Sequence, residues 1–144
     1  MARSPRAGGL AALGLALLTG GAAAHDFRAG ALRLDHPYAT PSVGDQGQLC
    51  LREIRNVGEA ADRLLSVSVA GVRTVLAPEG QALPLLLPAG SKQAWRHDQQ
   101  ACLRLQGLER PLQAGDRFDA MLRFERAGEA RVQVWVQQPR TKPN

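Results

Sequence analysis

The side chains of this sequence that bind metals or carry redox chemistry are three histidines and two cysteines. The histidines are His25, His36 and His97, and the cysteines are Cys50 and Cys102. Imidazole and thiolate are ligands for copper and zinc, so a metal site is the chemistry that these residue types allow. The sequence contains no nucleophile elbow, no His-x-x-x-His helix and no glycine-rich phosphate loop. We therefore expect a binding protein and not an enzyme.

His25 follows a segment with the composition of a secretory signal. Basic residues precede an apolar run over about residues 8–18, and Ala22 and Ala24 occupy the −3 and −1 positions of an A-x-A cleavage site. The apolar run is shorter than the ~20 residues that a membrane-spanning helix needs. We expect residues 1–24 to be a signal peptide that is removed. Cleavage would leave a periplasmic protein without a membrane anchor and with His25 as its first residue.

A histidine at the N-terminus offers a metal two nitrogen atoms, one from the α-amine and one from the ring. The amine has a pKa near ~7.7, so a metal displaces its proton easily at neutral pH. Nitrogen donors of this kind favour Cu(II) among the divalent metals. Asp26 offers a carboxylate, and His36 lies eleven residues on, near the expected end of the first strand. The alternative is a loose chain end, since any peptide that begins with histidine binds some Cu(II).

The two cysteines are the second candidate pair. Strand alternation turns Leu103 and Leu105 toward the core and Cys102 outward. The orientation of Cys50 stays open. If its leucine neighbours point inward, Cys50 faces out and can reach Cys102 in a disulfide or in a two-thiolate copper site. If Cys50 faces the core, it is a small buried hydrophobe and pairing with Cys102 is not expected.

The remaining ring residues have structural interpretations. His97 lies in the polar segment WRHDQQ and is expected to be a solvated turn residue. Trp95 and Trp135 each belong to an expected strand and are assigned to packing or to partly exposed positions.

Short apolar runs with a period of two dominate residues 25–137, and proline and glycine signals separate them. In residues 130–136 this pattern places Val132, Val134 and Val136 on one face. Many short strands at this spacing predict an all-β, antiparallel Greek-key sandwich or small barrel in one domain. The expected strands cover residues 29–36, 47–55, 63–69, 72–77, 83–87, 92–96, 101–108, 117–125 and 130–136, and residues 138–144 form a polar tail.

The charge pattern excludes nucleic-acid binding. Of the 18 basic residues, two lie in the signal segment, which leaves 16 against 13 acidic residues, a formal charge of +3. Basic and acidic residues alternate along the chain, and aromatic residues make up 4% of it. A nucleic-acid surface requires a basic stripe with stacking rings, and this sequence has neither.

Five segments of the chain, in order, resemble the periplasmic copper(I) chaperones of the PCu(A)C family. These segments are HDFRAGALRLDHPYATP, RNVGEAADRLLSVS, LPLLLPAG, LQGLERPLQAGDRF and LRFERAGEARVQVWV. The resemblance implies a cupredoxin-like β-sandwich over residues 25–137. It also implies a site for Cu(I) made of two histidines and two methionines on two loops.

The residues that the resemblance maps to that copper site are different in this chain. The family's His-x-Met pair, placed just before Gly-Leu, corresponds here to Cys102 and Arg104. A guanidinium stays protonated and cannot ligate a metal. The family's methionine-rich hairpin corresponds to VLAPEGQALPLLLPAG, which contains neither histidine nor methionine. The usual Cu(I) ligands are therefore missing.

The sequence predicts an exported, copper-chaperone-like protein. We expect it to bind copper, as Cu(I) or Cu(II), through altered ligands among His25, His36, Cys50 and Cys102, and to deliver the metal to a periplasmic acceptor. One alternative is a metal-free module that binds a protein partner on the surface left by the lost site. The other is a Cu(II) binder that uses His25. In each case we expect a monomer.

Overall fold

The computed structural model describes residues 26–139, which form a nearly all-β fold. The strands are β1 (Asp26–Ala29), β2 (Leu32–Ala39), β3 (Gln46–Asn56), β4 (Asp62–Val69), β5 (Val72–Leu76), β6 (Leu85–Leu87), β7 (Lys92–Trp95), β8 (Leu103–Leu108), β9 (Arg117–Phe124) and β10 (Gly128–Val136). Two 3-10 turns, η1 (Pro78–Gly80) and η2 (His97–Gln99), interrupt the connections. Within residues 26–139, no helix has the length and apolarity needed to cross a bilayer. The expected signal segment and His25 lie outside the described residues.

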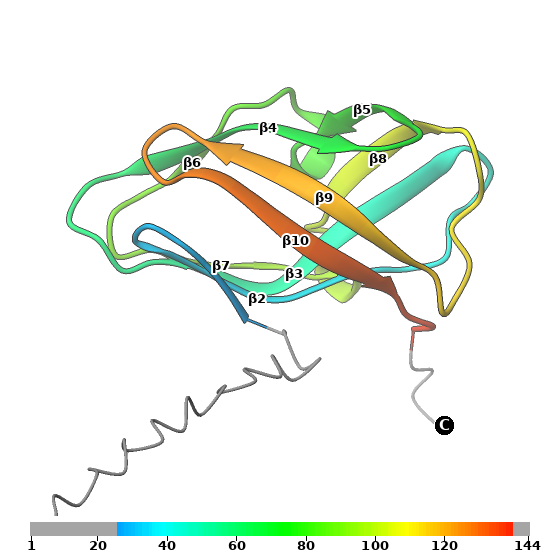
Figure 1. Ribbon diagram of the computed structural model, residues 1–144, viewed down its shortest axis with the longest axis horizontal. Helices are drawn as coiled ribbons and strands as arrows, with labels where there is room; N and C mark the ends of the chain where they lie inside the picture. The colour runs from blue at the N-terminus through cyan, green and yellow to red at the C-terminus, as the bar shows by residue number, and fades with distance from the viewer. Residues whose placement is uncertain (1–25, 140–144) are drawn as a thin grey trace, which may run out of the picture.

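The strands join in one sheet with the order β5-β8-β3-β2-β10-β9-β4-β6, to which β1 adds on β2 and β7 adds on β3. All pairings are antiparallel except that between β2 and β10, which is parallel through Trp135 and Tyr38. One core cluster joins residues of β3 and β8 with residues of β9 and β10, so the sheet curls on itself and encloses that core (Figure 1). The predicted all-β Greek-key sandwich is confirmed, with this one parallel contact as a departure from a purely antiparallel sheet.

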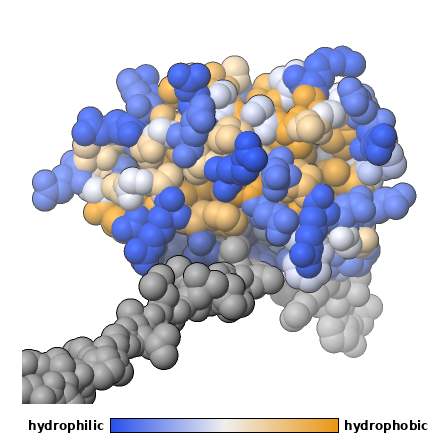
Figure 2. All heavy atoms as spheres, in the orientation of Figure 1, coloured by the Kyte–Doolittle hydropathy of each residue, from blue (hydrophilic) through white to orange (hydrophobic). Residues whose placement is uncertain are grey.

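Strand alternation decides which side chains fill the core. Val132, Val134 and Val136 of β10 are fully buried, as the sequence pattern predicts. On the neighbouring β9, Leu122 and Phe124 are buried beside them. Figure 2 shows hydrophilic side chains spread over one face of the molecule, with apolar surface visible between them.

The first expected strand, residues 29–36, is interrupted by a turn: residues 32–36 belong to β2, whereas Ala29 ends β1. Ala29 pairs with Leu32, so that Gly30 and Ala31 form a two-residue turn between β1 and β2. Gly30 adopts a positive φ of 53°, and a Cβ at this position would lie 3.3 Å from the Cα of Ala127. A left-handed conformation and a close backbone neighbour both favour glycine. The hairpin brings the first described residues of the chain alongside β2.

Candidate functional site

The β1–β2 hairpin places two carboxylates opposite each other. Asp26 and Asp35 are register partners, and their side chains share a hydrogen bond. Burial raises the pKa of the Asp35 carboxyl above its ordinary value, and the hydrogen bond with Asp26 raises it further. The Arg52 guanidinium lowers the pKa of Asp35, because its Nε lies 3.1 Å from Asp35 Oδ2. Arg52 thus offsets part of the negative charge of these two carboxyl groups.

His36 follows Asp35 and has an unusual backbone conformation. In the ladder between β2 and β3, the residues on either side of it pair regularly, Asp35 with Glu53 and Pro37 with Leu51. Its φ is +52°, in the left-handed region that few residues other than glycine adopt. Such a conformation persists only where the surroundings hold it, and it is found most often at functional sites. The His36 ring is half-buried, and its Nε2 lies 3.1 Å from Nε2 of Gln137.

His97 is held by Tyr38. The Tyr38 hydroxyl lies 2.8 Å from His97 Nδ1 and accepts a hydrogen bond of 3.1 Å from the His97 backbone N–H. Burial raises the pKa of the Tyr38 hydroxyl, so the phenol stays protonated and can donate to Nδ1. A neutral ring that accepts at Nδ1 carries its proton on Nε2. His97 is a turn residue, as the sequence predicts, but η2 holds it half-buried against Tyr38 and so not fully solvated.

A pocket of about 590 Å³ lies around these rings. The rings of His36 and His97 both lie close to Tyr38, with centroids 5.9 Å and 5.6 Å from the Tyr38 centroid. The pocket is lined by His36, Tyr38, Thr40, Arg52, Arg96, His97, Asp98, Gln137, Gln138 and Pro139. The structure thus brings two of the three histidines to one pocket. Within residues 26–139, however, no group of three or more His, Cys, Asp or Glu residues is arranged to hold a metal ion.

Cys50 and Cys102 form a disulfide. Leu49 and Leu51 point into the main core, and Cys50 lies on the other side of β3, as one of the two sequence alternatives proposed. Both cysteines are nevertheless buried, in a small cluster with Tyr38. The outward orientation expected for Cys102 therefore does not expose it. A disulfide sulfur is not a thiolate, so the two-thiolate copper site is not formed.

The segments that correspond to the two ligand loops of the PCu(A)C family lie side by side. Arg104 of β8 pairs with Leu76 of β5, which leads into η1. A Cβ on Gly80 at the end of η1 would lie 3.0 Å from Nη1 of Arg104. The Arg104 guanidinium therefore occupies the space next to η1. A cationic group in this place and a disulfide at Cys102 do not fit a copper ion.

Of the four candidate ligands from the sequence, Cys50 and Cys102 are bonded to each other, and His36 lies at the pocket beside Tyr38. His25 is outside the described residues. Sequence reasoning did not find Gln137, which contacts His36 from the end of β10. No local pattern marks this glutamine, because its role arises from the parallel contact between β2 and β10.

Comparison with known proteins gives a family and a fold. None of the curated proteins matches the chain. Three solved structures share the fold with TM-scores of 0.71 to 0.72. The apo PCuAC domain from PmoF1 is 22% identical and covers 80% of this chain and 100% of its own. The copper-bound PCuAC domain from PmoF2 is 23% identical, covering 80% and 99%, and the apo PmoF2 PCuAC domain is 23% identical, covering 81% and 98%.

The family assignment rests on a separate match. A model of LpqE-like lipoproteins matches residues 32–136, which include every strand from β2 to β10. The matched span is most of the chain and contains all of the buried core cluster except Ala29. The chain belongs to the LpqE-like family and has the fold of a PCuAC domain.

Proposed function

We propose that this protein is exported, binds Cu(II) at the open end of the β1–β2 hairpin, and passes the copper to an acceptor protein. Export is supported by the lipoprotein family to which the chain belongs and by the signal-like composition of residues 1–24. A copper-handling role is supported by the PCuAC fold, of which one relative was solved with copper bound.

The register of the β1–β2 hairpin is the observation that carries the proposal. Ala29 pairs with Leu32, and each step away from the turn advances both strands by one residue, as far as Asp26 and Asp35. In the sequence, His25 directly precedes Asp26 and His36 directly follows Asp35. With residues 1–24 removed, His25 would supply its α-amine and ring nitrogen and His36 a further ring nitrogen. Three nitrogen donors suit Cu(II) better than its divalent neighbours.

The electrostatics of the hairpin end support a divalent ion there. Asp26 and Asp35 stand next to the proposed ligands in the sequence and face each other across the hairpin. A divalent cation nearby would stabilise both carboxylates in the charged form. Copper binding at this site would release the α-amine proton, because only the neutral amine is a ligand.

The exposure of this region supports transfer by ligand exchange. Asp26 is exposed, and Asp35 and His36 are half-buried, so the hairpin end is accessible from solvent. An incoming ligand from an acceptor could approach the copper without unfolding of the core. In contrast, the cysteines are buried and bonded to each other, and we do not propose them as ligands.

Titration of the mature chain with Cu(II) against a competing chelator tests the proposal. We expect one site per molecule when the chain begins at His25. Acetylation of the His25 α-amine removes this donor without supplying another, and we expect it to weaken binding by at least about tenfold. His36→Ala should weaken binding by a similar order, and electron paramagnetic resonance should show fewer nitrogen ligands.

His97→Ala is the matched control, because His97 is the other histidine at the pocket and is held by Tyr38. We expect it to retain Cu(II) affinity within about threefold. A mature protein that binds Cu(II) no more tightly than a short peptide beginning His-Asp-Phe would contradict the proposal.

Arg104 supports a second candidate function, that of a metal-free module. The surface that carries the copper ligands in the PCu(A)C family carries a guanidinium in this chain, next to η1. A positive surface of this kind suits a protein partner with acidic groups. If copper binding fails as described, retention of a periplasmic partner by the wild type and its loss by Arg104→Glu would support this second function.

A further inference from the structure

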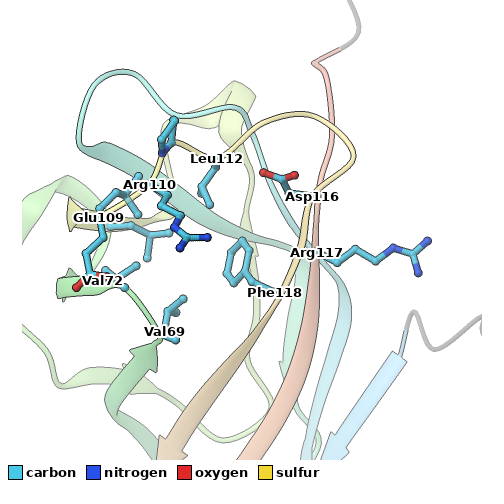
Figure 3. A pocket seen from close by; sticks show the side chains of 13 residues that line it. Val69, Val72, Glu109, Arg110, Leu112, Asp116, Arg117 and Phe118 are labelled. Carbon is cyan, nitrogen blue, oxygen red and sulfur yellow. The ribbon is translucent and has the colours of Figure 1, made fainter.

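A second pocket, of about 520 Å³, lies apart from the residues discussed so far. It is enclosed by the turn between β4 and β5, the end of β8, and the connection from β8 to β9 (Figure 3). Its volume falls within the ~300–1,000 Å³ range that is usual for small-molecule sites. No residue of the proposed copper site lines it.

The interior of this pocket is apolar. Val69, Val72, Leu108, Leu112 and Phe118 are half-buried and pack against the main core from the pocket side. Their pocket-facing surfaces remain partly accessible to solvent. A ligand with an apolar body would bury them and gain the corresponding hydrophobic free energy.

One charged group lies over this apolar surface. Figure 3 shows the Arg110 guanidinium directed over the pocket toward Phe118, whereas Arg117 extends away from it. Arg117 is engaged elsewhere, because its Cζ lies 4.9 Å from the ring centroid of Trp135. In the part of the chain that the structure describes, Arg110 takes part in none of the salt bridges.

The two acidic residues of the rim do not neutralise Arg110. Asp116 Oδ2 accepts a hydrogen bond of 2.9 Å from the backbone N–H of Gln113, so this carboxylate interacts within its own loop. The Glu109 side chain lies along Gly71 at the margin, next to Val72 (Figure 3). The pocket therefore presents one unpaired guanidinium above an apolar floor. A guanidinium binds a carboxylate in a two-pronged geometry.

We propose that this pocket binds a small amphipathic monocarboxylate, with the carboxylate on Arg110 and the hydrocarbon part on Leu112 and Phe118. The inference is independent of copper, since none of these residues belongs to the hairpin site. We expect hydrocarbon ligands with a neutral or cationic head to bind this pocket more weakly, because they offer the Arg110 guanidinium no anionic partner.

Binding of decanoate to the copper-free protein tests the inference. Isothermal titration calorimetry, or two-dimensional NMR of the backbone amides, should show one saturable site with shifts at residues 108–118. Decanol has the same chain without the charge, and we expect it to bind about five- to tenfold more weakly. Arg110→Gln should weaken decanoate by the same factor and leave decanol unchanged.

Arg131→Gln is the matched control, because Arg131 is an exposed arginine on the outer face of β10 and does not line the pocket. It should leave decanoate binding unchanged. Val69→Phe fills the pocket and should weaken both ligands. The inference is overturned if decanoate does not saturate a site, if Arg110→Gln binds it as the wild type does, or if the shifted amides lie outside the pocket.

Discussion

Cys50 of β3 and Cys102, next to the start of β8, are bonded to each other with their Cα atoms 4.7 Å apart and a sequence separation of 52. Leu49 and Leu103, their neighbours in the chain, are register partners in the β3–β8 ladder. The disulfide therefore ties together two strands that are already adjacent in the sheet. It lies on the side of these strands that Tyr38 and η2 cover.

Removal of the disulfide should destabilise the fold. A covalent link that closes a loop of 52 residues restricts the unfolded chain, and the loop-length relation gives about 4 kcal/mol for this effect. We expect Cys50→Ala/Cys102→Ala to lower the free energy of unfolding by about 2–4 kcal/mol in urea denaturation. The reduced wild type should be destabilised similarly, whereas the double variant should not respond to reductant. Two titratable thiols in the unreduced exported protein would show that the bond is absent.

Asp62 and Asn56 explain a motif that the sequence analysis noted without assigning a role. Asp62 is buried at the start of β4, and its carboxylate accepts hydrogen bonds from the backbone N–H groups of Arg63, Arg126 and Ala127. It thus joins β4 to the turn between β9 and β10. The Asn56 amide donates to Ala60 O and Leu87 O. The segment from residue 55 to residue 64 is a structural signature, with no part in the proposed site.

Asp62→Ala should lower the free energy of unfolding by about 2–4 kcal/mol, because it leaves three backbone N–H groups without their charged acceptor. Chemical denaturation measures this loss. Glu59→Ala is a suitable control, since Glu59 is exposed in the same loop and its change should cost less than about 0.5 kcal/mol. Equal stability of the two variants would refute the role given to Asp62.

Much of the fold could be predicted because apolar residues at every second position of a strand mark the side chains that are buried. Leu103, Leu105 and the valines of β10 follow a period of two, and all are buried. The β1–β2 turn was missed because Ala-Gly-Ala is compatible with either a strand or a turn, and only the close approach of Ala127 selects the turn. Burial of Cys102 was missed because alternation gives the side of a strand but not what covers that side.

The candidate site was less predictable, since it depends on contacts between distant segments. His97 and Tyr38 are 59 residues apart, and Gln137 and His36 are 101 residues apart. A single sequence contains no signal for such pairs. The pairing of Asp26 with Asp35 could not be derived either, because it requires knowing that the chain turns at Gly30.

Gly107 should resist substitution. Its φ is +71°, and a Cβ at this position would lie 2.6 Å from the Cβ of Arg73 on the neighbouring strand. Neither the backbone conformation nor the space admits a side chain without movement of β5. We expect Gly107→Ala to lower the melting temperature and to cost about 1–3 kcal/mol. Gly90→Ala is the control, because its φ is also positive but nothing lies within 4 Å, so its cost should be smaller. Equal losses of unfolding free energy in the two variants would show that the contact with Arg73 does not determine the cost of Gly107→Ala.

Gln137 should determine which nitrogen of His36 binds copper. The side-chain amide of Gln137 contacts His36 Nε2 at 3.1 Å, so Nε2 is engaged in either amide orientation, and we expect copper to bind at Nδ1. A hydrogen bond to the second ring nitrogen fixes the ring and raises its basicity, and loss of such a contact commonly costs about tenfold or more in metal affinity. We expect Gln137→Ala to weaken Cu(II) by about tenfold and Gln137→Glu, whose carboxylate accepts from Nε2–H, to retain affinity. Gln138→Ala is the control, because Gln138 lines the same pocket and is exposed. If Gln137→Ala instead bound Cu(II) more tightly, Gln137 would be a competitor for the metal, and Nε2 would be the ligand.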